Sequence, residues 1–319
     1  MSQFINTIWA VVVMLAYACP GYILVKTKKL KEESIPNLVT LLLFICQPCL
    51  TVYSFQQATR MIHSGAFTVA ELGVRGIIFF ALTTAFHALS VGLFYLIFRR
   101  KQQRVPYRIF VIATTFSNCG FFGVPILSAI MPDHPEVAMY SAICSLVMNA
   151  LAWTIGSAII TRDKKYISWR KIVFNPNTLS AVVAIPLFCF NILLPDRVDS
   201  MVTLLAQFST PLCMIILGMR LATVPVRSLL SDHLPQWIML VKNLASPLLA
   251  FALAYFLPVD GYIKQVLFVL CCCPVANVVL SFAEMLNEGQ KTAANAVLLS
   301  TIFSLISLPV MCLLLPFLA

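Results

Sequence analysis

Long apolar runs separated by short polar segments make up almost the whole chain. Ten of these runs have about twenty residues, enough for a helix to cross the hydrocarbon core of a bilayer. Nearly charge-free runs of this length are typical of membrane helices and not of barrel strands. The pattern therefore predicts an all-α integral membrane protein with ten transmembrane helices. We place them at 4–25, 35–55, 73–98, 107–131, 137–160, 177–194, 201–221, 235–257, 262–286 and 293–318.

Composition supports the membrane class and excludes two others. Of the 319 residues, 60% are hydrophobic and 11% are charged, whereas about a quarter of a soluble domain is charged. The formal net charge is +10, but the lysines and arginines lie in short loops, which gives no support to nucleic-acid binding. The four histidines are scattered, and Cys46 and Cys49 form a lone C-x-x-C motif in an apolar run. We therefore expect neither a metal nor a cofactor.

Positive charges are concentrated in every second loop. The loops after the odd-numbered runs hold nearly all the lysine and arginine, for example at 26–31, 99–104 and 162–171. Because cytoplasmic loops carry this excess, these loops are predicted to be cytoplasmic and both termini extracytoplasmic. We expect a multi-pass protein of the cell membrane, plasma or inner.

Five helices per half would invert the second half relative to the first, which is a common plan of secondary transporters. On this basis the chain divides into a first five-helix repeat at 1–161, a cytoplasmic linker at 162–176 and a second, inverted five-helix repeat at 177–319.

The fourth run contains residues that interrupt a helix. Ser117, Asn118, Gly120, Gly123 and Pro125 lie within nine residues of an otherwise apolar segment. A broken helix at membrane depth survives only where protein or a polar cavity satisfies its backbone, and such helices mark substrate sites in transporters. A proline kink with glycines for close packing explains the same residues. The segment alone leaves both interpretations open, and the few residues after Pro125 place any break nearer 117–120.

The ninth run carries matching parts, with Pro274 and Asn277 at its middle. Since the fourth and ninth helices are predicted to run in opposite directions, breaks in both would aim two half-helix N-termini at one central region. Helix N-termini present unpaired N–H groups and a positive dipole end, which favour an anion. Asn118 and Asn277 would add amide donors to such a site.

Other polar residues inside the runs are weaker candidates. Glu284, near the cytoplasmic end of the ninth run, is a candidate for coupling or gating because acids within the membrane are commonly functional. Gln47, Asn149 and Gln207 are candidates for pathway lining, with interhelical hydrogen bonding as the alternative. Lys242 lies early in the eighth run, and we expect its ammonium to reach the cytoplasmic face.

Four motifs together resemble the auxin efflux carrier family, in particular its short, bacterial-type members. They are S-N-C-G-F-F-G-V-P at 117–125, N-P at 175–176, P-L-C-M-I-I-L-G-M-R-L at 211–221, and the proline, asparagine and F-A of 274–283. The resemblance implies two inverted five-helix repeats, with helices four and nine broken and crossing near their prolines, in the same superfamily as sodium-coupled bile-acid carriers. It also implies transport of organic anions by an elevator mechanism, and frequent homodimers.

The leading hypothesis is a secondary or facilitative transporter of small organic anions, such as mono- or dicarboxylates. A sodium-coupled symporter and a non-transporting sensor on the same fold are the alternatives. An intramembrane enzyme would need a catalytic pair at matching depths, and the sequence offers none, so no enzyme is expected. The predicted substrate-binding residues are Ser117, Asn118, Gly120, Gly123, Pro125, Pro274 and Asn277.

Overall fold

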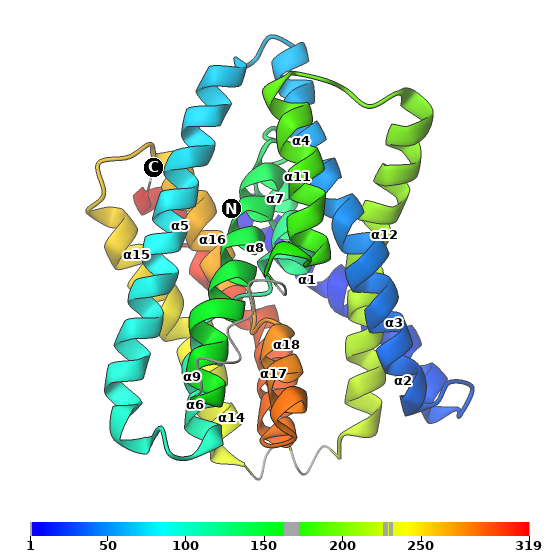
Figure 1. Cartoon of the computed structure of the whole chain (residues 1–319), viewed down its shortest axis with the longest axis vertical. Coiled ribbons are helices and arrows are strands. Elements are labelled where there is room, and N and C mark those ends of the chain that lie inside the picture. The colour runs from blue at the N-terminus through cyan, green and yellow to red at the C-terminus, as the bar shows by residue number, and fades with distance from the viewer. Residues whose placement is uncertain (1, 163–171, 226–228, 230–231, 319) are drawn as a thin grey trace.

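The computed structural model describes residues 2–162, 172–225, 229 and 232–318, which fold almost entirely into helices (Figure 1). This part of the chain contains no strand, only one isolated β-bridge. The prediction of an all-α protein is therefore confirmed. Most of the predicted linker at 162–176 falls on 163–171, which lie outside the described residues.

Seven helical segments of the described chain are long and apolar enough to cross a membrane, as expected for a multi-pass membrane protein. They coincide with seven of the ten predicted runs. The fourth, sixth and ninth runs are instead built from shorter apolar helices. The seven long segments are Ile5–Lys26, Glu32–His63, Val69–Lys101, Val137–Thr161, Asp196–Thr223, His233–Tyr255 and Gln290–Cys312.

Several long segments contain more than one helix, and three of them include one π-helical turn, which locally widens the helix. The first long segment contains α1 (Ser2–Ala16) and α2 (Ala18–Lys26), and the second contains η1 (Glu32–Ser34), α3 (Ile35–Leu41), π-helical η2 (Leu42–Cys46) and α4 (Gln47–His63). The third contains α5 (Val69–Phe98) and η3 (Arg99–Lys101), and the fourth contains α8 (Val137–Leu151), π-helical η5 (Ala152–Gly156) and α9 (Ser157–Thr161). The sixth contains α14 (His233–Leu240), π-helical η7 (Val241–Ala245) and α15 (Ser246–Tyr255). The uninterrupted helices are α11 (Pro176–Cys189), α12 (Asp196–Thr223) and α18 (Gln290–Cys312), which the short η8 (Leu315–Leu318) follows.

Among the helices of the described residues, four have a side-chain cap that the structure shows. Thr68, Asn175, Asp232 and Asp260 each accept a hydrogen bond from a backbone N–H two or three residues further on. A capping oxygen satisfies one of the N–H groups that the first helical turn leaves unpaired. These caps fix where α5, α11, α14 and α16 (Gly261–Cys272) start.

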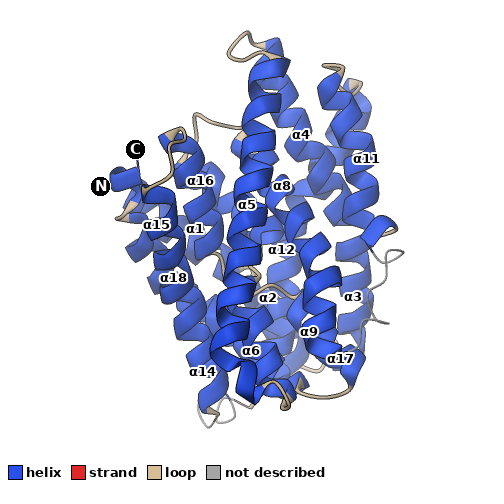
Figure 2. Cartoon of the chain, turned by 60° about the vertical axis from the view of Figure 1, so that its left-hand side comes forward, coloured by secondary structure: helices blue, strands red, loops and turns tan. Residues whose placement is uncertain are grey.

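The helices surround a buried centre. α8 is buried along most of its length and lies in the middle of the molecule in both cartoon views, while α5 runs nearly its full height (Figures 1 and 2). α2 and α12 cross closely because Gly21 and Gly218 have no side chains: a Cβ at Gly21 would lie 2.0 Å from the carbonyl oxygen of Ile215. Small residues at such crossings are typical of membrane helices.

The fourth and ninth runs are each interrupted. In the fourth, α6 (Val105–Thr115) ends before an extended Phe116, and the chain resumes as π-helical η4 (Cys119–Gly123) and α7 (Val124–Ile130). Pro125 does not cause this interruption, because it lies in the first turn of α7, where a missing N–H is tolerated. In the ninth, α16 (Gly261–Cys272) ends at an extended Cys273 and α17 (Val278–Leu286) follows. Pro274 does contribute to this second interruption, since a proline disfavours the helical conformation of the residue before it, which here is Cys273.

Candidate functional site

The two interruptions are hydrogen-bonded to each other in the middle of the protein. The backbone N–H of Asn118 donates to the carbonyl of Pro274 at 2.8 Å, and that of Ala276 donates to the carbonyl of Phe116 at 3.0 Å. Between these bonds, Ser117 and Val275 form the isolated antiparallel bridge. Backbone groups freed by the ends of α6 and α16 are thus satisfied by protein, as membrane depth requires.

A polar pocket of about 250 Å³ adjoins this crossing. Its walls come from α3, η2, α4, η4, α8, η5, α11, α12 and α17, with residues of the second interruption. We call it the polar pocket. It is lined by Val39, Leu42, Leu43, Phe44, Gln47, Asn118, Gly120, Phe121, Ser145, Met148, Asn149, Trp153, Asn175, Pro176, Asn177, Ile216, Arg220, Ala276, Asn277, Val278 and Ser281.

The polar pocket brings together five residues that the sequence singled out. Asn118 and Gly120 come from the first interruption, Asn277 comes from the second, and Gln47 and Asn149 come from α4 and α8. Gly120 lies tightly against its neighbours, since a Cβ there would be 3.2 Å from the hydroxyl of Ser145. An alanine at this position would push into the pocket wall.

Among the described residues that line the polar pocket, Arg220 alone has a charged side chain, and the sequence did not point to it. It lies near the C-terminal end of α12, and 25% of its side chain is exposed. Its Nη1 lies 3.7 Å from Oε1 of Glu284 on α17, so Glu284 reaches the pocket through Arg220. An arginine one residue from the end of an apolar run can reach the membrane surface and is usually counted with the loop charges, so its sequence position does not distinguish Arg220 as a site residue.

A second group missed from the sequence is a buried hydrogen-bond network centred on Asn177. Its Oδ1 accepts from the hydroxyl of Thr51 at 2.7 Å and from Nε2 of Gln47 at 3.5 Å, and its Nδ2 donates to the hydroxyl of Ser145 at 3.1 Å. Asn177 lies in the first turn of α11, which Asn175 caps. The network therefore holds Gln47 and the N-terminal end of α11 against the pocket.

Cys213 of α12 contacts the pocket asparagine of the second interruption. Nδ2 of Asn277 lies 3.8 Å from its sulfur, within the range of a hydrogen bond to a thiol. Cys213 is buried, with 3% of its surface exposed. Because Asn277 and Cys213 belong to different helices, this weak contact would be broken by any displacement of α17 along α12.

Four of the predicted binding residues do not line the polar pocket. Ser117 is buried but is not part of the pocket lining, and the carbonyl of Pro274 accepts from the backbone N–H of Asn118. Gly123 allows helix packing, since a Cβ there would lie 2.5 Å from Leu270. Pro125 lines a different cavity.

The expectation for Lys242 is wrong. Its ammonium does not reach the cytoplasmic face: 1% of the residue is exposed, and Nζ donates to the hydroxyl of Ser117 at 2.7 Å and to the carbonyl of Cys271 at 3.1 Å. Lys242 lies in the π-helical turn η7. Such a turn changes the direction of the side chains around it, which a regular helical pattern does not anticipate.

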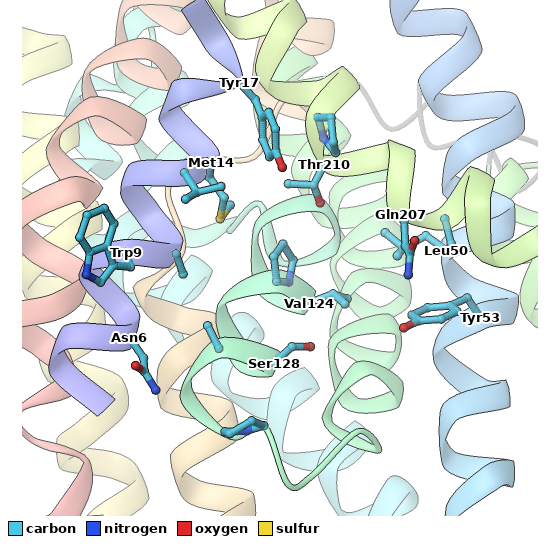
Figure 3. Close-up of a pocket in the computed structure, with 17 residues that line it drawn as sticks. Asn6, Trp9, Met14, Tyr17, Leu50, Tyr53, Val124, Ser128, Gln207 and Thr210 are labelled. Atoms are coloured by element: carbon cyan, nitrogen blue, oxygen red, sulfur yellow. The ribbon is translucent and has the colours of Figure 1, made fainter. Parts of the chain in front are cut away.

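A larger cavity of about 650 Å³ borders α1, α4, α7 and α12, and we call it the wide cavity (Figure 3). Gln207 and Pro125 line it, and Figure 3 shows Gln207, Tyr53 and Ser128 directed into it. None of the described residues along its walls is charged. Next to the wide cavity, the hydroxyl of Thr210 donates to the carbonyl of Phe121, a residue of the polar pocket, at 2.8 Å. This contact lies between the two spaces.

The chain is similar to known membrane proteins along nearly its whole length. A family model described as membrane transport protein matches residues 5–312. Auxin efflux carrier component 2 of Oryza sativa subsp. japonica is 25% identical over 153 residues, which are 47% of this chain and 24% of that protein. Auxin efflux carrier component 3 of Arabidopsis thaliana is 23% identical over 153 residues, with the same shares covered. The chain spans about a quarter of the length of these two relatives.

Proposed function

Because the chain belongs to the membrane transport protein family, whose members are transporters and not enzymes, we propose that it carries small organic anions such as mono- or dicarboxylates. The resemblance to auxin efflux carriers and the prediction that the chain is not an enzyme are thereby confirmed. The substrate site we propose is the polar pocket. The observation that carries the proposal is Arg220 in its wall, which also includes the amide side chains of Asn118 and Asn277.

The chemistry of the polar pocket supports an anion over a neutral or cationic substrate. The guanidinium of Arg220 presents several N–H donors in a planar fork that matches a carboxylate. The pocket also includes residues at the N-terminal ends of α11 and α17, where the positive end of the helix dipole favours negative charge. Phe44, Phe121 and Trp153 line the remaining wall and would contact the apolar body of an organic acid.

The arrangement of the pocket supports alternating access by an elevator movement. Gln47, Asn177 and Arg220 come from α4, α11 and α12, whereas Asn118 and Asn277 come from the two interruptions. We propose that these two groups of helices move relative to each other, and that substrate reaches the polar pocket directly from one side of the membrane and through the wide cavity from the other. The Thr210–Phe121 bond would separate the approaches in this conformation.

We also propose the number and the orientation of the membrane spans. When the fourth and ninth runs, each with its interruption, and α11 are counted as one span each beside the seven long segments, we propose ten crossings in two inverted sets of five. Charge bias supports extracytoplasmic termini in the cell membrane. A homodimer rests on the family resemblance alone.

Flux measurements test the function. Purified protein in proteoliposomes should take up labelled mono- or dicarboxylates in a saturable manner, and replacing both Asn118 and Asn277 by alanine should abolish most of that uptake. Equal uptake by the wild type and the double variant would remove the polar pocket as the site. Saturable binding without flux would indicate a sensor instead.

A further inference from the structure

Lys242 is a buried cation that the proposed binding of substrate does not use. It is among the largest fully buried side chains of the described residues, and no carboxylate is paired with it in that part of the chain. Its electrostatic neighbours include the thiols of Cys119, Cys144, Cys271, Cys272 and Cys273 and the imidazole of His87. An ammonium is seldom buried without an opposite charge, so its position calls for a reason.

The ammonium bridges the two interruptions. Its first acceptor, the hydroxyl of Ser117, lies in the break after α6. Its second acceptor, the carbonyl of Cys271, belongs to the last turn of α16. The last carbonyls of a helix have no intrahelical partner and carry the negative end of the dipole. A positive charge at this point therefore stabilises both broken helices at once.

Ser246 extends the same arrangement by one turn. It follows Lys242 by four residues and donates its hydroxyl to the carbonyl of Thr114, in the last turn of α6, at 2.8 Å. The segment from η7 to α15 thus donates a hydrogen bond to the C-terminal end of each interrupted helix. The ammonium of Lys242 is the donor to α16, and the neutral hydroxyl of Ser246 is the donor to α6.

In transporters with broken helices, the C-terminal ends of half-helices and unwound carbonyls are where a coupling cation binds. Here the ammonium of Lys242 occupies such a place. We propose that Lys242 is a built-in counter-cation that replaces a soluble coupling ion, so that transport does not depend on sodium. This rests on the proposed transport function, but the ion-binding part can be measured without transport.

Two substitutions at this position separate the charge from the packing. Lys242→Ala removes the ammonium and leaves a cavity that ends at the hydroxyl of Ser117 and the carbonyl of Cys271. Lys242→Met removes the charge but fills much of the space with an unbranched side chain. Lys264→Ala, on the first turn of α16 and far in sequence from its last turn, is the matched control for loss of a lysine.

Carboxylate flux should be measured in proteoliposomes with sodium, with N-methylglucamine, or with propylammonium as the cation. We expect wild-type and Lys264→Ala flux to be the same in all three. Both Lys242 variants should lose roughly tenfold or more in N-methylglucamine, the effect of losing hydrogen bonds to a charged group. Propylammonium, which has the three carbons and the nitrogen that Lys242→Ala removes, should restore the flux of the alanine variant and not that of the methionine variant, because only the first has room for it.

A thermal-unfolding measurement on purified protein keeps the two proposals distinguishable. Propylammonium should raise the Tm of Lys242→Ala and leave the Tm of the wild type unchanged, whether or not any carboxylate is transported. Sodium-dependent wild-type flux would overturn the inference, and so would wild-type flux in Lys242→Met. A folded Lys242→Ala whose Tm and flux propylammonium does not raise would overturn it as well. If Lys242→Ala does not fold, the flux of Lys242→Met tests the inference by itself: a loss of flux supports it, and wild-type flux overturns it.

Discussion

The polar pocket and the wide cavity both border the η4–α7 segment, yet they differ in chemistry. The wide cavity is more than twice as large, at about 650 Å³ against about 250 Å³, but no described residue along it is charged. The polar pocket holds Arg220, several amides and the first residues of α11 and α17. Size alone would select the wrong space for an anion, because affinity for a carboxylate comes from positive charge and aimed N–H donors.

The largest effect should come from the cation of the polar pocket. Arg220→Gln keeps a polar side chain but removes the charge, and hydrogen bonds to a charged group contribute about 1.5–3 kcal/mol. Carboxylate affinity, measured by binding to purified protein, should fall roughly 10- to 150-fold. Arg220→Lys should recover part of the loss, since it restores the charge without the planar fork. An unchanged affinity in Arg220→Gln would show that the anion binds elsewhere.

The next effect should come from the amide of the first interruption. Asn118→Ala removes one donor from the polar pocket without changing its charge, and we expect affinity to fall about tenfold. Asn6→Ala in the wide cavity is the matched control and should leave affinity unchanged. Equal losses in the two variants would erase the distinction between the two spaces.

Glu284 should have a smaller effect in the opposite direction. Its carboxylate lies 3.7 Å from Arg220 and competes with a substrate carboxylate for the guanidinium. The pair is partly exposed, and such pairs contribute up to about 1 kcal/mol, so Glu284→Gln should strengthen binding about two- to fivefold. Glu288→Gln, which changes an acid beyond the end of α17, is the control. Weaker binding in Glu284→Gln would mean that the acid positions Arg220 and does not compete.

The smallest effect is expected in the wide cavity. Gln207→Ala shortens a polar side chain that Figure 3 shows directed into this space. If the cavity is only an approach, affinity should change by less than about twofold, as is usual for exposed positions outside a binding site. A loss as large as that of Asn118→Ala, in the same binding assay, would make the wide cavity a second site.

The interrupted helices could be predicted because their signal is local. A membrane helix satisfies its own backbone, so asparagine, glycine and proline inside an apolar run stand out against it. Asn118, Gly120 and Asn277 were found in this way and lie together in the polar pocket. The position of the first interruption also followed from sequence, since too few residues remain after Pro125 for a second half-helix of useful length.

The cations could not be assigned from the same signal. Arg220 stands near the end of its apolar run, where an arginine is usually counted with the cytoplasmic charges, and its contact with the pocket depends on how α12 lies against α17. Lys242 was expected at the membrane surface because its depth was judged from distance along a regular helix. The π-helical turn and the packing of η7 against both interruptions decide its position, and neither is local in sequence.

A structure determined with a saturating carboxylate tests the central claim most directly. The account predicts the carboxylate within hydrogen-bonding distance of the Arg220 guanidinium and of the amides of Asn118 and Asn277, with Glu284 moved away from Arg220. A carboxylate bound beside Gln207 in the wide cavity, with the polar pocket unchanged, would contradict it.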